Sequence, residues 1–341
     1  MQDKPIISPD VTIRDVAEAA GVSISLVSFV LNARRGPNGE YLCSASQQTA
    51  ERIVEAAERL GYHRNKAASS LRSGHSDTIG IIVSDISNTC FSQICRKIES
   101  LAGAAGYLTI IASSDDRAEN FRQLGDKFLY SGVDGFIVAP CRGVEESLEK
   151  IRKRNIPVVL FDRDLPGLEG VGRVLLDNEL AGRYAVKILR KRGCSNVRLI
   201  RYETDIQTLL DREAGCRSEA EASGIHFSTS IVSRETMRRD IVSVLHSAKD
   251  EGSDGVVFPS NTITVDGISA VYELGYDIPA DLSVVGFDQE ARAEMLNPYF
   301  SFVNQPTKLV AEYSFKMLMD AIEGDGGSET RVLNPLYQLG K

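Results

Sequence analysis

The sequence predicts an α/β protein in which a small all-helical head precedes two similar α/β lobes. Residues 11–32 and 46–60 carry apolar side chains at helical spacing, with capping residues at their starts. From residue 78 onward, apolar runs of strand length alternate with longer amphipathic stretches. A faint repeat relates SGVDGFIVAP at 131–140 to EGSDGVVFPS at 251–260. This repeat indicates that the α/β part consists of two related lobes.

The bulk composition limits the classes of function. At 341 residues the chain is longer than a domain with a single hydrophobic core usually is, so we expect two or more cooperating units. No window approaches the ~20 apolar residues of a membrane span, and the N-terminus lacks a signal-peptide pattern. We therefore expect a cytoplasmic protein. The net charge is −8, but residues 1–75 hold nine Lys and Arg against eight Asp and Glu. Nucleic-acid binding is therefore expected only in this segment.

The cysteines and histidines predict neither a metal site nor an active site. The six cysteines contain no CxxC pair and lie near none of the four histidines at metal-ligand spacing. We interpret them as reduced, mostly buried small hydrophobes rather than as a disulfide or zinc site. An enzyme is an alternative for an α/β sheet, but no GxGxxG, GxxxxGK[ST] or GxSxG motif stands at a strand-to-helix junction. The sequence thus predicts no enzyme and no cofactor.

The segment VTIRDVAEAAGVSISLVSFVLN predicts two short helices joined by a tight turn at Gly21. Thr12 and Asp15 form a capping-box pattern at the first helix, and Ser23 precedes the second. This is the helix-turn-helix pattern, although an ordinary αα-hairpin inside a larger domain is an alternative. The third amphipathic helix, at 46–60, favours an independent three-helix head, which we place at residues 1–62.

A polar segment follows the head. Residues 63–77 hold only Leu71 as a bulky apolar side chain, which predicts a linker that is able to form a short hinge helix. The remaining residues, 78–341, carry the continuous apolar runs that are typical of parallel strands covered on both faces. One such run in each half ends on an aspartate, Asp162 and Asp288. Polar residues just past strand ends indicate a ligand cleft between the lobes.

The order of these segments along the chain resembles the lactose-repressor (LacI/GalR) family of bacterial transcription regulators over almost the full length of the sequence. The matching segments include TIRDVAEAAGVSISLVSFVLN, ERIVEAAERLGYHRNKAASSLRSG, TIGIIVSDISN, VDGFIVAP, LLDNELAG and LSVVGFD. The resemblance implies a repressor whose core is shaped like periplasmic sugar-binding proteins. It also implies a homodimer, double-stranded operator DNA and a small-molecule effector, a sugar or sugar derivative, as partners, without a membrane. A secreted sugar-binding protein would share the core but not residues 11–73.

The resemblance assigns DNA contacts to the head and to the hinge helix. Polar side chains of the head would touch phosphates, namely Thr12, Ser23, Ser28 and Asn32. Three residues of the second helix would face base edges, namely Ile24, Ser25 and Phe29. The hinge helix, Asn65 to Ser73, would contact DNA through Asn65, Ala68 and Leu71, with Leu71 as a minor-groove wedge.

The head departs from the family pattern at two places. Ile24 and Phe29 are apolar where the family usually has polar side chains, so they suit thymine methyl groups rather than guanine acceptors. The alternative for Phe29 is a place in the core of the head. The loop at 33–45 is also longer than usual, and Arg34 and Arg35 are either additional phosphate contacts or part of a solvated surface loop.

The resemblance also assigns an effector cleft between the lobes. Its residues carry the amide, carboxylate and guanidinium groups that bind sugar hydroxyls, with one aromatic ring. They are Asn88, Phe91, Asp162, Arg163, Arg212, Asn261 and Asp288. The alternative for each carboxylate is a helix cap or a surface charge. Cys90 stands where the family often has an aromatic, which leaves the identity of the effector open.

Overall fold

The computed structural model describes residues 11–31, 34–35, 41–62, 75–288, 298–326 and 328–340. The chain divides into two compact units, Met1–Ser76 and Asp77–Lys341, which we call the head and the core. No described helix is long and apolar enough to cross a membrane. The predicted hinge segment falls mostly outside the described residues.

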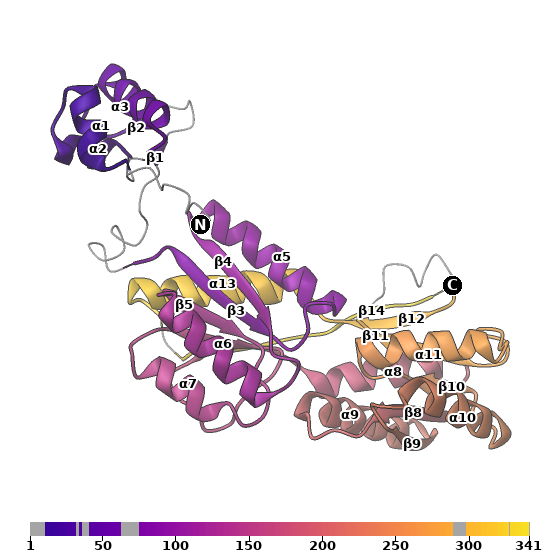
Figure 1. Ribbon diagram of the computed structural model, residues 1–341. Helices are drawn as coiled ribbons and strands as arrows, with labels where there is room; N and C mark the ends of the chain where they lie inside the picture. The colour runs from indigo at the N-terminus through magenta and orange to yellow at the C-terminus, as the bar shows by residue number, and fades with distance from the viewer. Residues whose placement is uncertain are drawn as a thin grey trace, which may run out of the picture. The chain divides into compact units, whose positions relative to one another are not determined.

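The head contains the three predicted helices, α1 (Ile13–Ala20), α2 (Ile24–Leu31) and α3 (Gln47–Leu60) (Figure 1). Glycines end α1 and α3 because Gly21 and Gly61 adopt positive φ values of 63° and 65°, which cost a residue without Cβ little.

Side-chain caps begin all three helices of the head. Asp15 accepts hydrogen bonds from the backbone N–H and the hydroxyl of Thr12, both at 2.7 Å, and these bonds lower its pKa. Ser23 and Ser46 accept from the third helical N–H of α2 and α3, each at 3.2 Å.

The three helices bury one apolar cluster of their own. Val16, Val27 and Ile53 are fully buried at its centre, and alanines such as Ala17 allow the helices to approach closely. The alternative of a hairpin embedded in a larger domain is therefore wrong, because the head has a separate core. Phe29 does not join this core, since 49% of its surface is exposed.

A short hairpin lies between α2 and α3, where the sequence indicated only a loop. Strands β1 (Arg34–Arg35) and β2 (Tyr41–Leu42) pair antiparallel, with Arg35 opposite Tyr41. The Gln47 side chain fixes the second strand to α3, because its amide both accepts from the Tyr41 N–H at 2.9 Å and donates to the Tyr41 carbonyl at 2.8 Å. The turn itself, residues 36–40, is outside the described residues.

The core consists of two lobes, each built on a six-stranded sheet in its described part (Figure 1). The first-lobe strands are β3 (Thr78–Val83), β4 (Leu108–Ser113), β5 (Gly135–Val138), β6 (Val158–Phe161), β7 (Gly172–Leu176) and β13 (Thr330–Leu333). The second-lobe strands are β8 (Asn196–Tyr202), β9 (His226–Val232), β10 (Gly255–Val257), β11 (Ser283–Phe287), β12 (Ser301–Asn304) and β14 (Leu336–Gln338).

Both sheets repeat one topology, which confirms the two related lobes. The first five strands of each lobe stand in the order 2-1-3-4-5 and are parallel, and only β14 pairs antiparallel to its neighbour. Their central strands are continuously buried, as in β3 and β11, because helices cover both faces.

Helices form the outer layers of both lobes (Figure 1). One face of the first sheet packs against α5 and α13, and the opposite face packs against α6 and α7. In the second lobe, α8 and α9 mainly cover one face, and α10 and α11 the other. The first-lobe helices are α5 (Thr89–Ala104), α6 (Ala118–Tyr130), α7 (Glu145–Arg152) and α13 (Thr307–Glu323), and the second-lobe helices are α8 (Asn178–Lys191), α9 (Gln207–Ser223), α10 (Met237–Asp250) and α11 (Asn261–Glu273).

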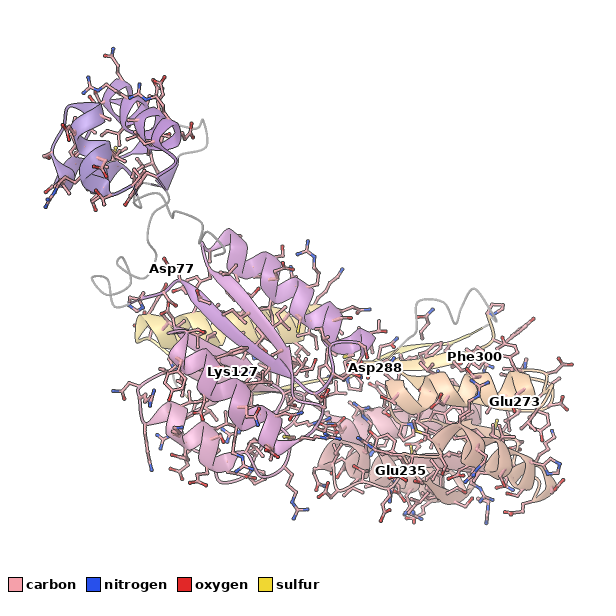
Figure 2. The ribbon with its side chains drawn as sticks, viewed as in Figure 1. Asp77, Lys127, Glu235, Glu273, Asp288 and Phe300 are labelled. Carbon is pink, nitrogen blue, oxygen red and sulfur yellow. The ribbon has the colours of Figure 1, made fainter. Side chains whose placement is uncertain are left out.

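Among the described residues, the chain passes between the lobes at three places. These are between β7 and α8, between β12 and α13, and between β13 and β14. Asp288, which follows β11, lies where the two lobes meet (Figure 2). The crossings bring the carboxyl ends of strands from both sheets to one junction.

Candidate functional site

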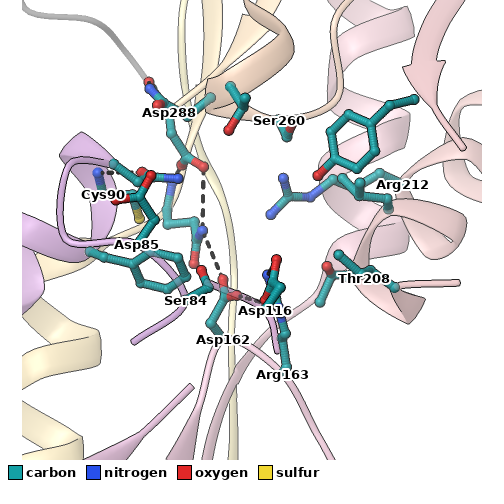
Figure 3. Close-up of a pocket in the computed structure, with 18 of the residues that line it drawn as sticks. Ser84, Asp85, Cys90, Asp116, Asp162, Arg163, Thr208, Arg212, Ser260 and Asp288 are labelled. Atoms are coloured by element: carbon teal, nitrogen blue, oxygen red, sulfur yellow. Dashed lines mark hydrogen bonds and ion pairs between the residues drawn. The ribbon is translucent and has the colours of Figure 1, made fainter. Parts of the chain in front are cut away.

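A polar cavity of about 370 Å³ lies at this junction of the lobes (Figure 3). Ser84 and Asp162 follow strands of the first sheet, and Ser260 and Asp288 follow strands of the second. This position agrees with the general rule that ligands bind outside the carboxyl ends of parallel strands. The volume lies within the range that is common for small-molecule sites.

The cavity brings together the residues that the sequence predicted for an effector cleft. All seven line it, namely Asn88, Phe91, Asp162, Arg163, Arg212, Asn261 and Asp288. Asn88 is also the N-cap of α5, because its side chain accepts from the Cys90 N–H at 2.9 Å. Asp162 and Asp288 each directly follow a buried strand; no described helix begins at Asp162, and the residues after Asp288 lie outside the described ones. Their assignment as ligand contacts stays a prediction.

Arg212 projects into the cavity from α9 and is only 3% exposed (Figure 3). Its Nε donates to Asn178 Oδ1 at 2.9 Å, and its Nη1 donates to the Pro259 carbonyl at 2.8 Å. The guanidinium also stacks over the ring of Phe287, 4.7 Å from its centroid. These contacts fix the direction of the guanidinium.

Two glycines make this placement of Arg212 possible. A Cβ on Gly182 of α8 would lie 2.0 Å from the Arg212 carbonyl oxygen, and a Cβ on Gly215 of α9 would lie 2.0 Å from the Glu179 carbonyl oxygen. Any side chain at either position would therefore force the helices apart. The close crossing holds Asn178, at the start of α8, within hydrogen-bond distance of Arg212.

Gln305 joins the two predicted aspartates, one from each lobe. Its Nε2 donates to Asp162 Oδ1 at 3.1 Å and to Asp288 Oδ2 at 3.3 Å. Both aspartates have positive φ, 64° and 56°, a conformation that Asp tolerates better than most residues. Burial raises the pKa of Asp288, against the opposing effect of the Arg212 charge. Gln305 lies at a crossing between the lobes, and its side chain therefore connects an aspartate of the first lobe with one of the second.

Asp116 pairs with two arginines that line the cavity, Arg163 and Arg234. Both its carboxylate oxygens accept from Arg163, and its Oδ2 lies 3.7 Å from Arg234 Nη2. Arg163 also lies 3.5 Å from Asp162. Although burial alone would lower the pKa of Arg163, the charges of Asp162 and Asp116 raise it. Arg234, which follows β9 in the second lobe, stacks on Tyr202 at 4.3 Å.

The apolar lining comes from both lobes. Phe91 and Tyr202 line the cavity and are largely buried, and Phe91 meets Phe161 edge-to-face at 5.9 Å. Cys90 lines the cavity as a buried thiol, and burial raises its pKa well above the ordinary value. All six cysteines are free, and every one except Cys43 is buried.

Sequence reasoning missed several lining residues. Asp116 follows β4 and obeys the same strand-end rule as Asp162, so its position was an available signal. Arg234 follows the half-exposed edge strand β9, which carries no continuous apolar run. Gln305 follows the four-residue strand β12, which is too short to stand out as an apolar run. For these two, only the fold brings the residue to the site.

The DNA-recognition surface predicted in the head is solvent-exposed where the structure describes it. Ile24 and Phe29 are 43% and 49% exposed on α2, and Ser25 is also exposed. Thr12 and Ser23 are exposed at the starts of α1 and α2, whereas Ser28 is half-buried. Asn32, Asn65, Ala68 and Leu71 lie outside the described residues.

Comparison with known proteins identifies the two units. Residues 12–65 match the model of the lacI family of bacterial regulatory proteins, and residues 79–326 match that of the periplasmic binding protein domain. The ribose operon repressor of Halalkalibacterium halodurans is 29% identical, over 92% of this chain and 90% of its own.

Solved structures show the same fold. A putative ribose operon repressor from Burkholderia thailandensis is 28% identical, with a TM-score of 0.69 over 77% of this chain and 99% of its own. The Lac repressor bound to ONPG is 21% identical, with a TM-score of 0.79 over 97% of this chain and 99% of its own. The chain thus joins a head with the DNA-binding domain of the lacI family of bacterial regulatory proteins to a core that belongs to the periplasmic binding protein domain family.

Proposed function

We propose that this chain is a repressor whose head binds operator DNA as a homodimer and whose core holds a sugar that controls this binding. The class of function follows from the family, whose members compared above are transcriptional repressors rather than enzymes. One observation carries the proposal: a lacI-type head and a polar cavity between two lobes occur in the same chain.

The exposed face of α2 supports the DNA side of the proposal. Apolar side chains as exposed as Ile24 and Phe29 contribute little to the core of the head, and their position suits contact with thymine methyl groups in the major groove. Hydroxyl and amide groups of Thr12, Ser23, Ser28 and Asn32 would hold phosphates and fix the register of the helix. Ser25 supplies a polar contact between the two apolar ones.

The hinge segment extends the proposal to the minor groove. Asn65, Ala68 and Leu71 would lie on a hinge helix that forms only when two copies meet on DNA, with Leu71 as the wedge between base pairs. Movement of the lobes that separates the hinges would melt these helices and release the DNA. This is how a ligand in the core would act on the head.

The cavity supports a sugar as the effector. Carboxylates, amides and guanidiniums line it, and such groups bind vicinal hydroxyls. The aromatic rings of Phe91 and Tyr202 would supply apolar contact for the carbon face of a sugar ring. Two of the proteins compared above are described as ribose operon repressors, so ribose is the first candidate to test.

The proposal predicts a palindromic operator. If the full chain is used to select from random duplex DNA, the enriched site should contain two inverted half-sites about one helical turn, or ~34 Å, apart, because a twofold dimer presents two recognition helices at that spacing. Thymines should dominate the bases that face Ile24 and Phe29. Enrichment of a single asymmetric site, or of no site, would count against the proposal.

A further inference from the structure

Each arginine that the structure describes in the cavity already has partners. Arg212 donates to Asn178 and Pro259, Arg163 pairs with Asp116 and Asp162, and Arg234 pairs with Asp116. A ligand that carries a phosphate requires a guanidinium or ammonium group that is able to face it. A phosphate that faces Arg163 or Arg234 in this cavity would have to displace a carboxylate first, whereas Arg212 is held by uncharged partners.

The charge balance of the lining also disfavours an anion. Its described side chains include three arginines, Arg163, Arg212 and Arg234, against five aspartates, Asp85, Asp115, Asp116, Asp162 and Asp288. Like charges within a poorly solvated cavity repel more strongly than in water. The first turn of α5 offers little compensation, because Asn88 already accepts from its Cys90 N–H.

Asp116 contributes most to this charge balance, because its single carboxylate pairs with two guanidiniums. Arg163 lies beside Asp116 and belongs to the same lobe (Figure 3). Arg234 follows β9 of the opposite lobe, so Asp116 joins cations across the cleft. The pair with Arg163 is mostly shielded from solvent, with 14% of the arginine side chain and 22% of the aspartate side chain exposed. Without Asp116, Arg234 has no other carboxylate partner among the described ion pairs, and Arg163 keeps only Asp162.

We propose that Asp116 is a specificity-determining residue that reserves the cleft for uncharged sugars and excludes phosphorylated ones. It does so by neutralising Arg163 and Arg234, whose guanidiniums would otherwise form a phosphate site. This inference rests on the proposed function, since it concerns the ligand of the same cleft. It assigns a role to a residue that the sequence did not single out.

The test replaces the carboxylate without disturbing the backbone. Asp116 has a φ of 54°, and Asn tolerates this left-handed conformation, so Asp116→Asn removes the charge at small conformational cost. Asp116→Gly is a second variant that fits the same φ. Asp205→Asn is the matched control, because Asp205 also pairs with an arginine of the other lobe, Arg142, but lines a neighbouring cavity of about 600 Å³.

Binding of D-ribose, D-ribose 5-phosphate and inorganic phosphate is measured by calorimetry for the full chain and the three variants. The wild type should bind ribose and not ribose 5-phosphate. Asp116→Asn and Asp116→Gly should gain affinity for ribose 5-phosphate by about tenfold or more, because charge-assisted hydrogen bonds to two released guanidiniums become available. Asp205→Asn should behave as the wild type does.

Two results would overturn the inference: a wild type that binds ribose 5-phosphate as tightly as ribose, or Asp116 variants that gain no affinity for either phosphate probe. If no form of the chain binds ribose but the Asp116 variants gain affinity for inorganic phosphate, the role of Asp116 is supported. In that case ribose is excluded as the effector, and the failure lies with that part of the proposed function.

Discussion

Replacement of Arg212 by alanine is expected to lower the affinity of the core for its sugar by about tenfold or more, because truncating one member of a buried polar network leaves its partners unsatisfied at roughly 1 to 3 kcal/mol each. Asn178 Oδ1 and the Pro259 carbonyl both lose their donor in this variant. Asp288 loses the nearby positive charge that opposes the rise of its pKa. Calorimetric titration with the sugar measures the effect.

Arg217→Ala is the matched control for this prediction. Arg217 lies on the same helix, five residues further along, but it is 48% exposed and pairs with Glu213 outside the cavity. Its removal should leave sugar affinity unchanged, since exposed ion pairs contribute little. Thermal unfolding of both variants separates a loss of binding from a loss of fold. An Arg212→Ala core that is folded and binds sugar with wild-type affinity would remove Arg212 from the site.

Removal of residues 1–76 is expected to abolish operator binding and to leave a folded core that binds sugar. The core has its own apolar clusters in both lobes, and Asp77 at its start remains tied to Asp134 by a hydrogen bond of 2.8 Å. Residues 76–341 carry a net charge of −9, which disfavours contact with DNA phosphates. Electrophoretic or fluorescence titration with the selected operator measures the loss.

The outcome depends on salt, so the full chain and the core are compared at physiological ionic strength. The full chain should bind the operator there, whereas the core should not, even at concentrations that saturate its sugar site. Operator binding by the core alone would show that the DNA site does not lie in the head.

Local signals in the sequence predicted the parts of the fold that local interactions determine. The ends of α1 and α3 were predictable because a glycine at positive φ and a capping side chain act within one helical turn. The central strands were predictable because burial on both faces leaves a continuous apolar run, as in β3 and β11. The edge strand β9 escaped prediction because its sequence, HFSTSIV, carries no continuous apolar run.

The site was predictable only where a strand end or a family motif marked it. Asp162 and Asp288 follow buried strands, so sequence alone placed them at the cleft. The bridge from Gln305 to both aspartates joins residues 143 and 17 positions apart, and no periodicity encodes such a contact. The pairing of Asp116 with Arg234 across the lobes is likewise a property of the assembled fold. The sequence therefore indicates which residues line the cleft, but it does not indicate which of their charges pair with one another.

The central claim is that a ligand in the cleft of the core controls the affinity of the head for DNA. The most direct measurement is a titration of the full chain with the selected operator, without sugar and with saturating sugar. The account predicts that sugar changes the dissociation constant by about 5- to 150-fold, the usual range for coupled sites, and that operator DNA changes sugar affinity by the same factor. Arg212→Ala should abolish the change at the same sugar concentration. Equal operator affinity with an empty and with a saturated cleft would contradict the account.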